Sequence, residues 1–247
     1  MNYEQCGIIE FPSFPHYHIT TMLTSDSLQF LYDLSQNNNR DWFEKNKKRY
    51  ESTLKKPFEA TVAAIIERVQ GFEPGFGPLL PKDCIFRIYR DTRFSKDKTP
   101  YKTNVAAAFT PKGTKGNAEM MSYPGYYFHL EFGSLWIGGG AYFLDKEPLH
   151  RVRTAIAQDP KAFRAVYNTP DFMEKFGGLA KSEVNKVMPP DLKEAAKQEP
   201  LLLNKQFYFM AEMDPETAIR ADFPDFIAAH FRAGKPLNDW LRTVIQV

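Results

Sequence analysis

The spacing of apolar residues changes along the chain, and these changes predict the order of helices and strands. Apolar side chains recur every three or four positions over residues 24–36 and 40–70, which predicts two helical segments. Pro57 lies inside the second segment and is expected to kink or split it, because proline has no amide hydrogen to donate to a helix. The stretch 71–82 is rich in Pro and Gly but contains two Phe and two Leu, so we expect it to pack against the body of the protein.

Alternating apolar and polar residues then predict a set of strands. The pattern favours strands at about 84–90, 101–109, 126–132 and 135–143. Strands that follow one another through short turns form antiparallel pairs. The polar residues 110–124 are expected to form a flap between two of these strands. Glycines at 138–140 indicate a bulge or a close approach of the backbone to another segment.

Helical spacing returns in the last hundred residues. We predict helices at 146–158 and 160–167, a late strand at 206–210, and two helices within 222–247 that are interrupted at 234–236. The expected architecture is an α+β fold, in which an antiparallel sheet from about 84 to 143 is flanked by N-terminal and C-terminal helices. We expect residues 22–247 to form a single α+β domain, preceded by an irregular leader at residues 1–21.

Composition describes an ordinary globular protein, with a local concentration of positive charge. The chain has 247 residues, of which 43% are hydrophobic and 25% are charged, and its formal net charge is +2. Residues 82–116 nevertheless carry nine Lys or Arg against three Asp. A nucleic-acid binder that uses its whole surface is usually basic throughout, so this asymmetry favours a focused anion site over a long polyanion track.

The two cysteines and the apolar runs bear on location. Cys6 and Cys84 are far apart in the sequence and neither belongs to a CxxC pair, which argues against a disulfide framework and favours the reducing cytoplasm. The first 21 residues lack the basic and apolar regions of a secretory signal. Since no run reaches the roughly 18 apolar residues that span a bilayer, we expect no membrane association.

The segment 84–102 is the strongest candidate for a binding site. It begins as an apolar strand and then becomes rich in cations, including three arginines whose planar guanidinium groups suit a carboxylate or phosphate. We expect the loop 91–101 to fold back and bring these cations to one concave surface. The alternative is a set of structural salt bridges within the loop. The predicted ligand-binding residues are Arg87, Arg90, Asp91, Arg93, Lys98, Tyr101 and Lys102.

Two histidine-containing patterns were considered for catalysis or metal binding. His129 and Glu131 share one face of the strand 126–132, where a carboxylate can orient an imidazole for acid/base work, so they are the candidate catalytic pair. The alternative is the polar outer face of a half-buried sheet. A zinc deaminase would also need a PCxxC motif, which this chain lacks. His16 and His18 would need further ligands, which a loose N-terminal leader rarely supplies, and we predict no metal site.

The run R-I-Y-R-D-T-R-F-S-K-D-K-T-P-Y-K at 87–102 resembles the signature of a bacterial family of uncharacterised proteins, domain-of-unknown-function family 2461. The segments 37–51 and 235–241 also look like parts of that family. The resemblance covers about 22–247 and implies a single unit with a shared motif, but no particular reaction or cofactor. Because the leader lies outside it, the resemblance favours Met22 as the natural start.

Three classes of function remain open from the sequence. The first is an enzyme or receptor for a small phosphorylated or carboxylated molecule, held by the arginine cluster. The second is a nucleic-acid-binding module that uses the basic 82–116 segment, with Tyr and Phe for stacking. The third is a structural or protein-interaction role.

Overall fold

A four-stranded antiparallel sheet forms the centre of the protein. The computed structural model describes residues 22–114 and 116–246, so His16 and His18 lie outside the described residues. Each strand pairs with its neighbour in the sequence, in the order β1-β2-β3-β4. The strands are β1 (Asn104–Phe109), β2 (Gly125–Glu131), β3 (Ser134–Ala141) and β4 (Phe207–Met213). The α+β class and the late strand are therefore confirmed.

The strand predicted at 84–90 does not form as a regular element. The short helix α4 (Pro81–Cys84) occupies its start, and the following residues make only two isolated bridges, Ile85 to Ala107 and Tyr89 to Tyr101. Ile85 and Tyr89 are four positions apart in the sequence, whereas their partners Ala107 and Tyr101 are six positions apart. The two sides differ in length, so a continuous ladder cannot form between them. The segment instead runs as an irregular edge beside β1.

The N-terminal helices confirm the effect expected of Pro57. Helix α1 (Ser25–Gln36) is followed by α2 (Arg40–Arg49), a π-helical segment at Tyr50–Lys55, and α3 (Lys56–Gln70). Pro57 lies in the first turn of α3, where a missing amide hydrogen costs least. The π-helical segment lies directly before α3 and accommodates the change in the hydrogen-bonding pattern there.

The C-terminal part ends in one long helix, where two had been predicted. Helix α10 (Phe223–Ile245) continues through Pro236 without a break. Gly234 serves packing, because a Cβ at this position would lie 2.0 Å from Cζ of Phe209 on β4. The other helices of this part are α6 (Lys146–Gln158), α7 (Pro160–Tyr167), α8 (Pro170–Phe176) and α9 (Ala195–Gln198).

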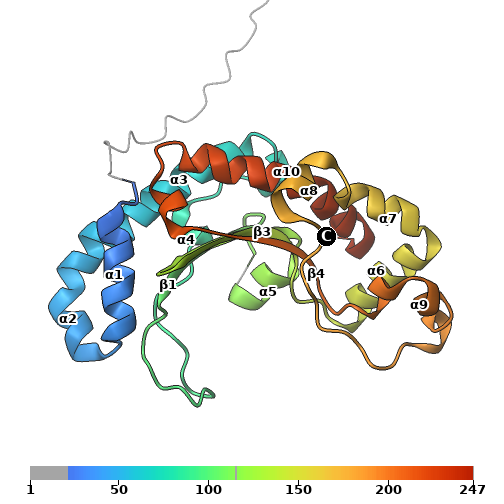
Figure 1. The fold of residues 1–247 in the computed structure, drawn as a ribbon, viewed down its shortest axis with the longest axis horizontal. Coiled ribbons are helices and arrows are strands. Elements are labelled where there is room, and N and C mark those ends of the chain that lie inside the picture. Colours follow the sequence, from blue (N-terminus) through green and yellow to red (C-terminus); the bar gives the residue numbers. More distant parts are fainter. Residues whose placement is uncertain (1–21, 115, 247) are drawn as a thin grey trace, which may run out of the picture.

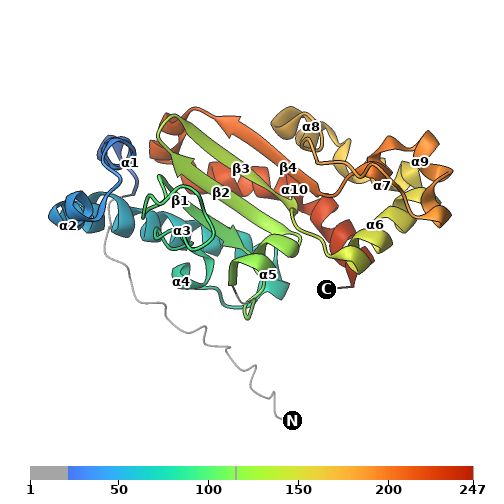
Figure 2. The ribbon, with the colours of Figure 1, turned by 90° about the horizontal axis from the view of Figure 1, so that it is seen from below.

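The two faces of the sheet have different surroundings. Helices α3 and α10 lie over one face, and α1 and α2 lie at the opposite end of the molecule from α6 to α9 (Figure 1). Phe128 and Leu130 of β2 are fully buried on the helix-covered face, whereas Tyr127 and His129 are only partly buried on the other. That second face is open, with α5 (Gly116–Ser122) near one end of it (Figure 2). The alternation predicted for this strand is confirmed.

Two loops predicted from the sequence pack against the body of the protein. The 71–82 segment packs on the body as expected, with Phe76 and Leu79 buried. The predicted flap at 110–124 contains helix α5, and the amides of Tyr142 and Phe143 donate to the carbonyl of Met121, which ties α5 to the end of β3. Within the described residues, no helix combines the length and apolar character needed to cross a bilayer.

Candidate functional site

A cavity of about 560 Å³ lies on the open face of the sheet. Its floor includes Ala106 and Ala108 of β1, and its walls include His129, Trp136 and residues of α5. The small side chains on β1 leave room above the sheet, while the aromatic side chains on β2 and β3 rise around it. A concave, mainly apolar space with few polar groups is the usual form of a small-molecule site.

The glycines of β3 keep the neighbouring backbones close under this cavity. A Cβ at Gly138 would lie 2.2 Å from the carbonyl oxygen of Phe209, and a Cβ at Gly140 would lie 2.5 Å from that of Phe207. Gly140 also has φ +102°, a conformation that residues with a Cβ rarely adopt. The close backbone approach predicted from the sequence is therefore confirmed. The close approach leaves no room for side chains at Gly138 and Gly140.

Among the residues that the structure describes, Lys102 is the lysine or arginine that lines this cavity. Its backbone N–H donates to the carbonyl of Ile88 at 2.7 Å, which fixes the residue just before β1. Its Nζ lies 5.3 Å from the centre of the Phe86 ring, and no carboxylate of the described residues pairs with it. Burial, and then the nearby positive charge of Arg87, lower the pKa of Lys102. The ammonium is thus available to a ligand.

His129 lines the same cavity from β2. The ring packs against Tyr127 and Trp136, with centroid distances of 5.5 and 6.1 Å, and its Nδ1 is buried and has no hydrogen-bond partner among the described residues. Burial lowers the pKa of His129, an effect partly opposed by the charge of Glu131, so the imidazole is favoured in its neutral form. Burial also raises the pKa of Tyr127 to about 12.

Glu131 is engaged elsewhere and does not line the cavity. The Ser134 hydroxyl donates to its Oε1 at 2.9 Å, and the Trp136 indole N–H donates to that hydroxyl at 2.9 Å. This chain of hydrogen bonds closes the turn between β2 and β3 and orients the indole ring beside the cavity. Glu131 therefore supports the wall, and His129 is the member of the predicted pair that faces the space.

The predicted arginine cluster is divided among local partners. Arg90 pairs with Asp97 and with Thr99 inside the loop. Arg93 makes two hydrogen bonds to Asp91, at 3.0 and 2.8 Å, and its side chain remains 77% exposed. These hydrogen bonds to the charged form hold the pKa of Asp91 at about 2. The loop uses its own carboxylates for these two arginines.

The remaining cations of the predicted site do not converge on one ligand position in the loop. Lys98 donates from Nζ to the carbonyl of Thr92 at 2.8 Å, which closes the loop on itself. Arg87 is exposed and makes no ion pair with any described carboxylate, although it lies near enough to affect the pKa of Lys102. The loop projects from the body on the side of the open face (Figure 1). Of the predicted cations, Lys102 alone lines the main cavity.

Tyr101 is part of the core, at the edge of a second and smaller hollow. Its ring stacks on Phe43 of α2 at 4.0 Å, and its backbone exchanges two hydrogen bonds with the side chain of Asn38, at 2.9 and 3.1 Å. These contacts join α2 to the loop. The hollow, of about 330 Å³, is also lined by Arg40 and Arg90.

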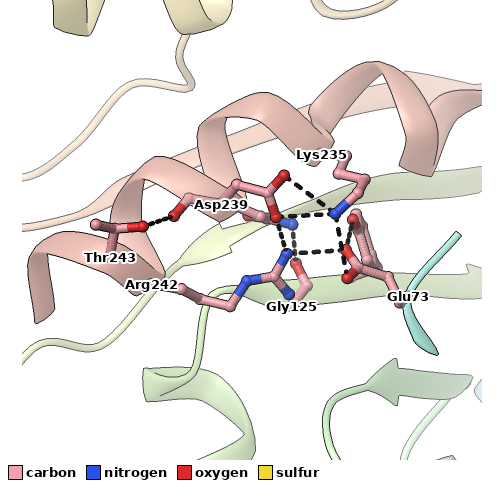
Figure 3. A network of polar contacts seen from close by, with 8 residues as sticks. Glu73, Gly125, Lys235, Asp239, Arg242 and Thr243 are labelled. Carbon is pink, nitrogen blue, oxygen red and sulfur yellow. Dashed lines mark hydrogen bonds and ion pairs between the residues drawn. The ribbon is translucent and has the colours of Figure 1, made fainter. Parts of the chain in front are cut away.

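A buried ionic network lies on the helix-covered side of the sheet. Glu73 is 5% exposed and accepts hydrogen bonds from Arg242 at 2.8 Å, from Lys235 at 3.3 Å and from the Tyr126 hydroxyl. Asp239 of α10 pairs with both cations (Figure 3). Every charged member has an opposite partner, so this network joins the 71–82 loop to α10 and β2.

Metal ligands are not gathered at either hollow. Among residues 22–114 and 116–246, no group of three or more His, Cys, Asp or Glu is arranged to hold a metal ion. The main cavity instead offers one lysine amine, one imidazole and several phenol hydroxyls, a set that suits an organic ligand.

Comparison with known families identifies the chain. A family model described as "Conserved hypothetical protein (DUF2461)" matches residues 26–240. The chain belongs to the DUF2461 family. No curated protein and no solved structure matches it. The description of DUF2461 states no activity, so the function has to be argued from the cavity.

Several cavity residues were missed by the sequence reasoning. The alternation that placed His129 and Tyr127 on one face also applies to β1, where it places Ala106 and Ala108 on the same side. The small side chains of Ala106 and Ala108 were the sequence feature from which free space on this face of β1 could have been predicted. Tyr142 and Tyr208 also line the cavity, but they come from segments whose proximity no local pattern indicates.

Proposed function

We propose that this protein binds a small carboxylate with an aromatic or apolar body in the cavity on the open face of the sheet. The observation that carries the proposal is Lys102, a partly buried cation that has no carboxylate partner within residues 22–114 and 116–246, in a cavity lined mainly by aromatic and small side chains. A ligand carboxylate would supply the missing partner, and the apolar body would cover Ala106, Ala108 and Trp136.

A carboxylate fits this site better than a phosphate ester does. Phosphate groups carry up to two charges and are usually held by several donors, often arginines or a helix N-terminus. Here Arg90 and Arg93 are already paired in the loop, which leaves Lys102 with Arg87 close to it. One desolvated ammonium and a second nearby cation suit a single negative charge.

The test is equilibrium binding of 3-phenylpropionate, measured by calorimetry and by thermal stabilisation of the full chain. We expect saturable binding, and a loss of about tenfold or more in affinity for Lys102→Met, because a hydrogen bond to a charged group contributes roughly 1.5–3 kcal/mol. Lys96→Met is the matched control, since Lys96 is an exposed lysine of the same basic segment. Equal affinities of the two variants would contradict the role of Lys102.

The same assay separates the other classes of function. A single-stranded DNA or RNA oligonucleotide that raises the melting temperature in low salt, while 3-phenylpropionate does not, would favour the nucleic-acid-binding alternative. Phenyl phosphate binding more tightly than 3-phenylpropionate would show that the site is built for a phosphate. If none of these molecules stabilises the protein, a structural or protein-interaction role gains support.

A further inference from the structure

We propose that Lys102 acts as a nucleophile and forms an imine with the oxo group of a 2-oxo acid bound in this cavity. The inference rests on the proposed carboxylate site and deepens it, since it names both the ligand class and the reaction.

The position of the amine is fixed by the edge of the sheet. Lys102 precedes Asn104, Ala106 and Ala108 at intervals of two, and all four residues line the cavity. The Lys102 backbone is held by its hydrogen bond to Ile88, and its side chain lies over the Phe86 ring. An amine placed against an aromatic wall at the cavity surface can approach a bound ligand without crossing bulk solvent.

The surroundings of Lys102 favour the free amine, and Lys235 shows the contrast. Nζ of Lys235 lies 2.9 Å from Asp239 and 3.3 Å from Glu73, so two carboxylates pair with that ammonium. Lys102 has no such partner among the described residues, and burial together with Arg87 lowers its pKa. Desolvation and a neighbouring cation are the two conditions that activate amine nucleophiles.

A 2-oxo acid matches this arrangement because its carbonyl carbon is bonded directly to its carboxylate. The carboxylate is attracted by Lys102 and Arg87, and this attraction brings the neighbouring oxo carbon to the amine. Once the amine has reacted, Arg87 is the nearby cation left to balance the carboxylate, since Arg87 makes no ion pair with a described carboxylate. The apolar side chain of the acid would cover the small residues of β1.

The reaction balances without an oxidant or a metal ion. The lone pair of Nζ attacks the oxo carbon and forms a C–N bond, while the electron pair of the C=O π bond moves to oxygen. Neutral His129, which lines the same cavity, accepts one proton from nitrogen and passes it to this oxygen, which gives a hydroxyl. The second nitrogen proton is then transferred to the hydroxyl, which leaves as water as the C=N bond forms. Amine and ketone thus give imine and water.

The experiment compares phenylpyruvate with 3-phenylpropionate, which has the same carbon skeleton without the oxo group. The full chain is incubated with phenylpyruvate and sodium cyanoborohydride, which reduces an imine to a stable secondary amine, and the modified lysines are mapped by mass spectrometry. We expect labelling of Lys102 to be about tenfold faster than labelling of the exposed Lys96, because binding places the oxo group beside an activated amine.

Two arginine variants complete the design. Lys102→Arg keeps the charge but removes the nucleophile, so it should lose the fast labelling. Lys96→Arg should retain the fast labelling. In the parent protein, an excess of 3-phenylpropionate should slow the labelling of Lys102.

The two proposals fail in different ways. If 3-phenylpropionate binds but phenylpyruvate labels Lys102 and Lys96 at similar rates, imine formation is overturned and the carboxylate site stands. If 3-phenylpropionate does not bind at all, the proposed function is wrong, and the inference built on it is wrong as well.

Discussion

The two faces of the sheet use polar groups in opposite ways. On the helix-covered face, Glu73 is surrounded by Arg242, Lys235 and the Tyr126 hydroxyl, so the buried charges are paired. On the open face, Lys102 and His129 are partly buried and lack such partners within the described part of the chain. Charges that are already paired satisfy one another within the fold, and groups left without partners can form interactions with a ligand.

The same difference applies to packing. Helix α10 approaches the sheet so closely that only a glycine fits at Gly234, because Phe209 fills the space. The open face instead combines Ala106 and Ala108 with aromatic walls, which leaves a cavity. On the helix-covered face, α10 and the sheet fill the space between them. On the open face, the described part of the chain leaves a cavity unfilled.

Glu73→Ala should give the largest loss of stability. Removing this carboxylate leaves Arg242, whose side chain is 11% exposed, and Lys235 with one acid fewer, and breaking a buried pair costs about 3–5 kcal/mol. The measurement is the free energy of unfolding in urea. Glu67→Ala is the control, because the Glu67 side chain is 77% exposed. Equal stabilities of the two variants would show that the network contributes little.

The adjacent residues Ala106 and Ala107 allow the faces to be compared directly. Ala107 is fully buried toward the helices, so Ala107→Leu should destabilise the protein by about 1–3 kcal/mol through overpacking. Ala106→Leu places the same atoms into the cavity, so it should change stability much less and should abolish binding of 3-phenylpropionate. Urea unfolding and calorimetry measure the two effects. Similar destabilisation by both variants would contradict the presence of free space on the open face.

The pH dependence of stability should reveal the buried state of His129. Its pKa is lowered in the folded protein, so the unfolded chain takes up the proton first as the pH falls, and stability declines below about pH 6.5. His129→Gln should flatten the plot of melting temperature against pH between about 7 and 5. Residual dependence is expected, because the pKa of His230 is lowered as well. A curve parallel to that of the parent protein would argue against burial of the imidazole.

Lys102→Met should have the smallest effect on stability. Since the folded state lowers the pKa of Lys102, the protonated form at neutral pH is disfavoured by folding, and its removal should leave the melting temperature unchanged or raised. Scanning calorimetry at pH 7 tests this. A clear fall in the melting temperature would mean that the Lys102 ammonium has a stabilising partner, as the cations around Glu73 have on the helix-covered face.

Local periodicity carried most of the fold prediction. The alternation around His129 and the helical spacing before and after Pro57 are properties of neighbouring residues, and both were confirmed. The prediction was wrong where tertiary contacts decided the outcome. The 84–90 strand is interrupted because its partner segment is longer, and Gly234 belongs to a continuous helix because α10 packs against Phe209.

The candidate site was predicted less completely for a related reason. The excess of cations over acids in the 82–116 segment was correct, but it did not show which cations are paired. Arg90 and Arg93 found partners within their own loop, whereas Lys102 faces the sheet. The alternative of structural salt bridges within the loop accounts for these two arginines, which pair with Asp97 and Asp91.

The sequence alone determined which side chains share a face of each strand, because that order depends only on the two-residue repeat of an extended backbone. It also determined that positive charge is concentrated beside the first strand. Only the tertiary structure decided which of those charges remain unpaired and where the sheet stays uncovered. Pairing and coverage depend on segments far apart in the sequence, such as β4 and α10, and local patterns carry no information about where such segments meet.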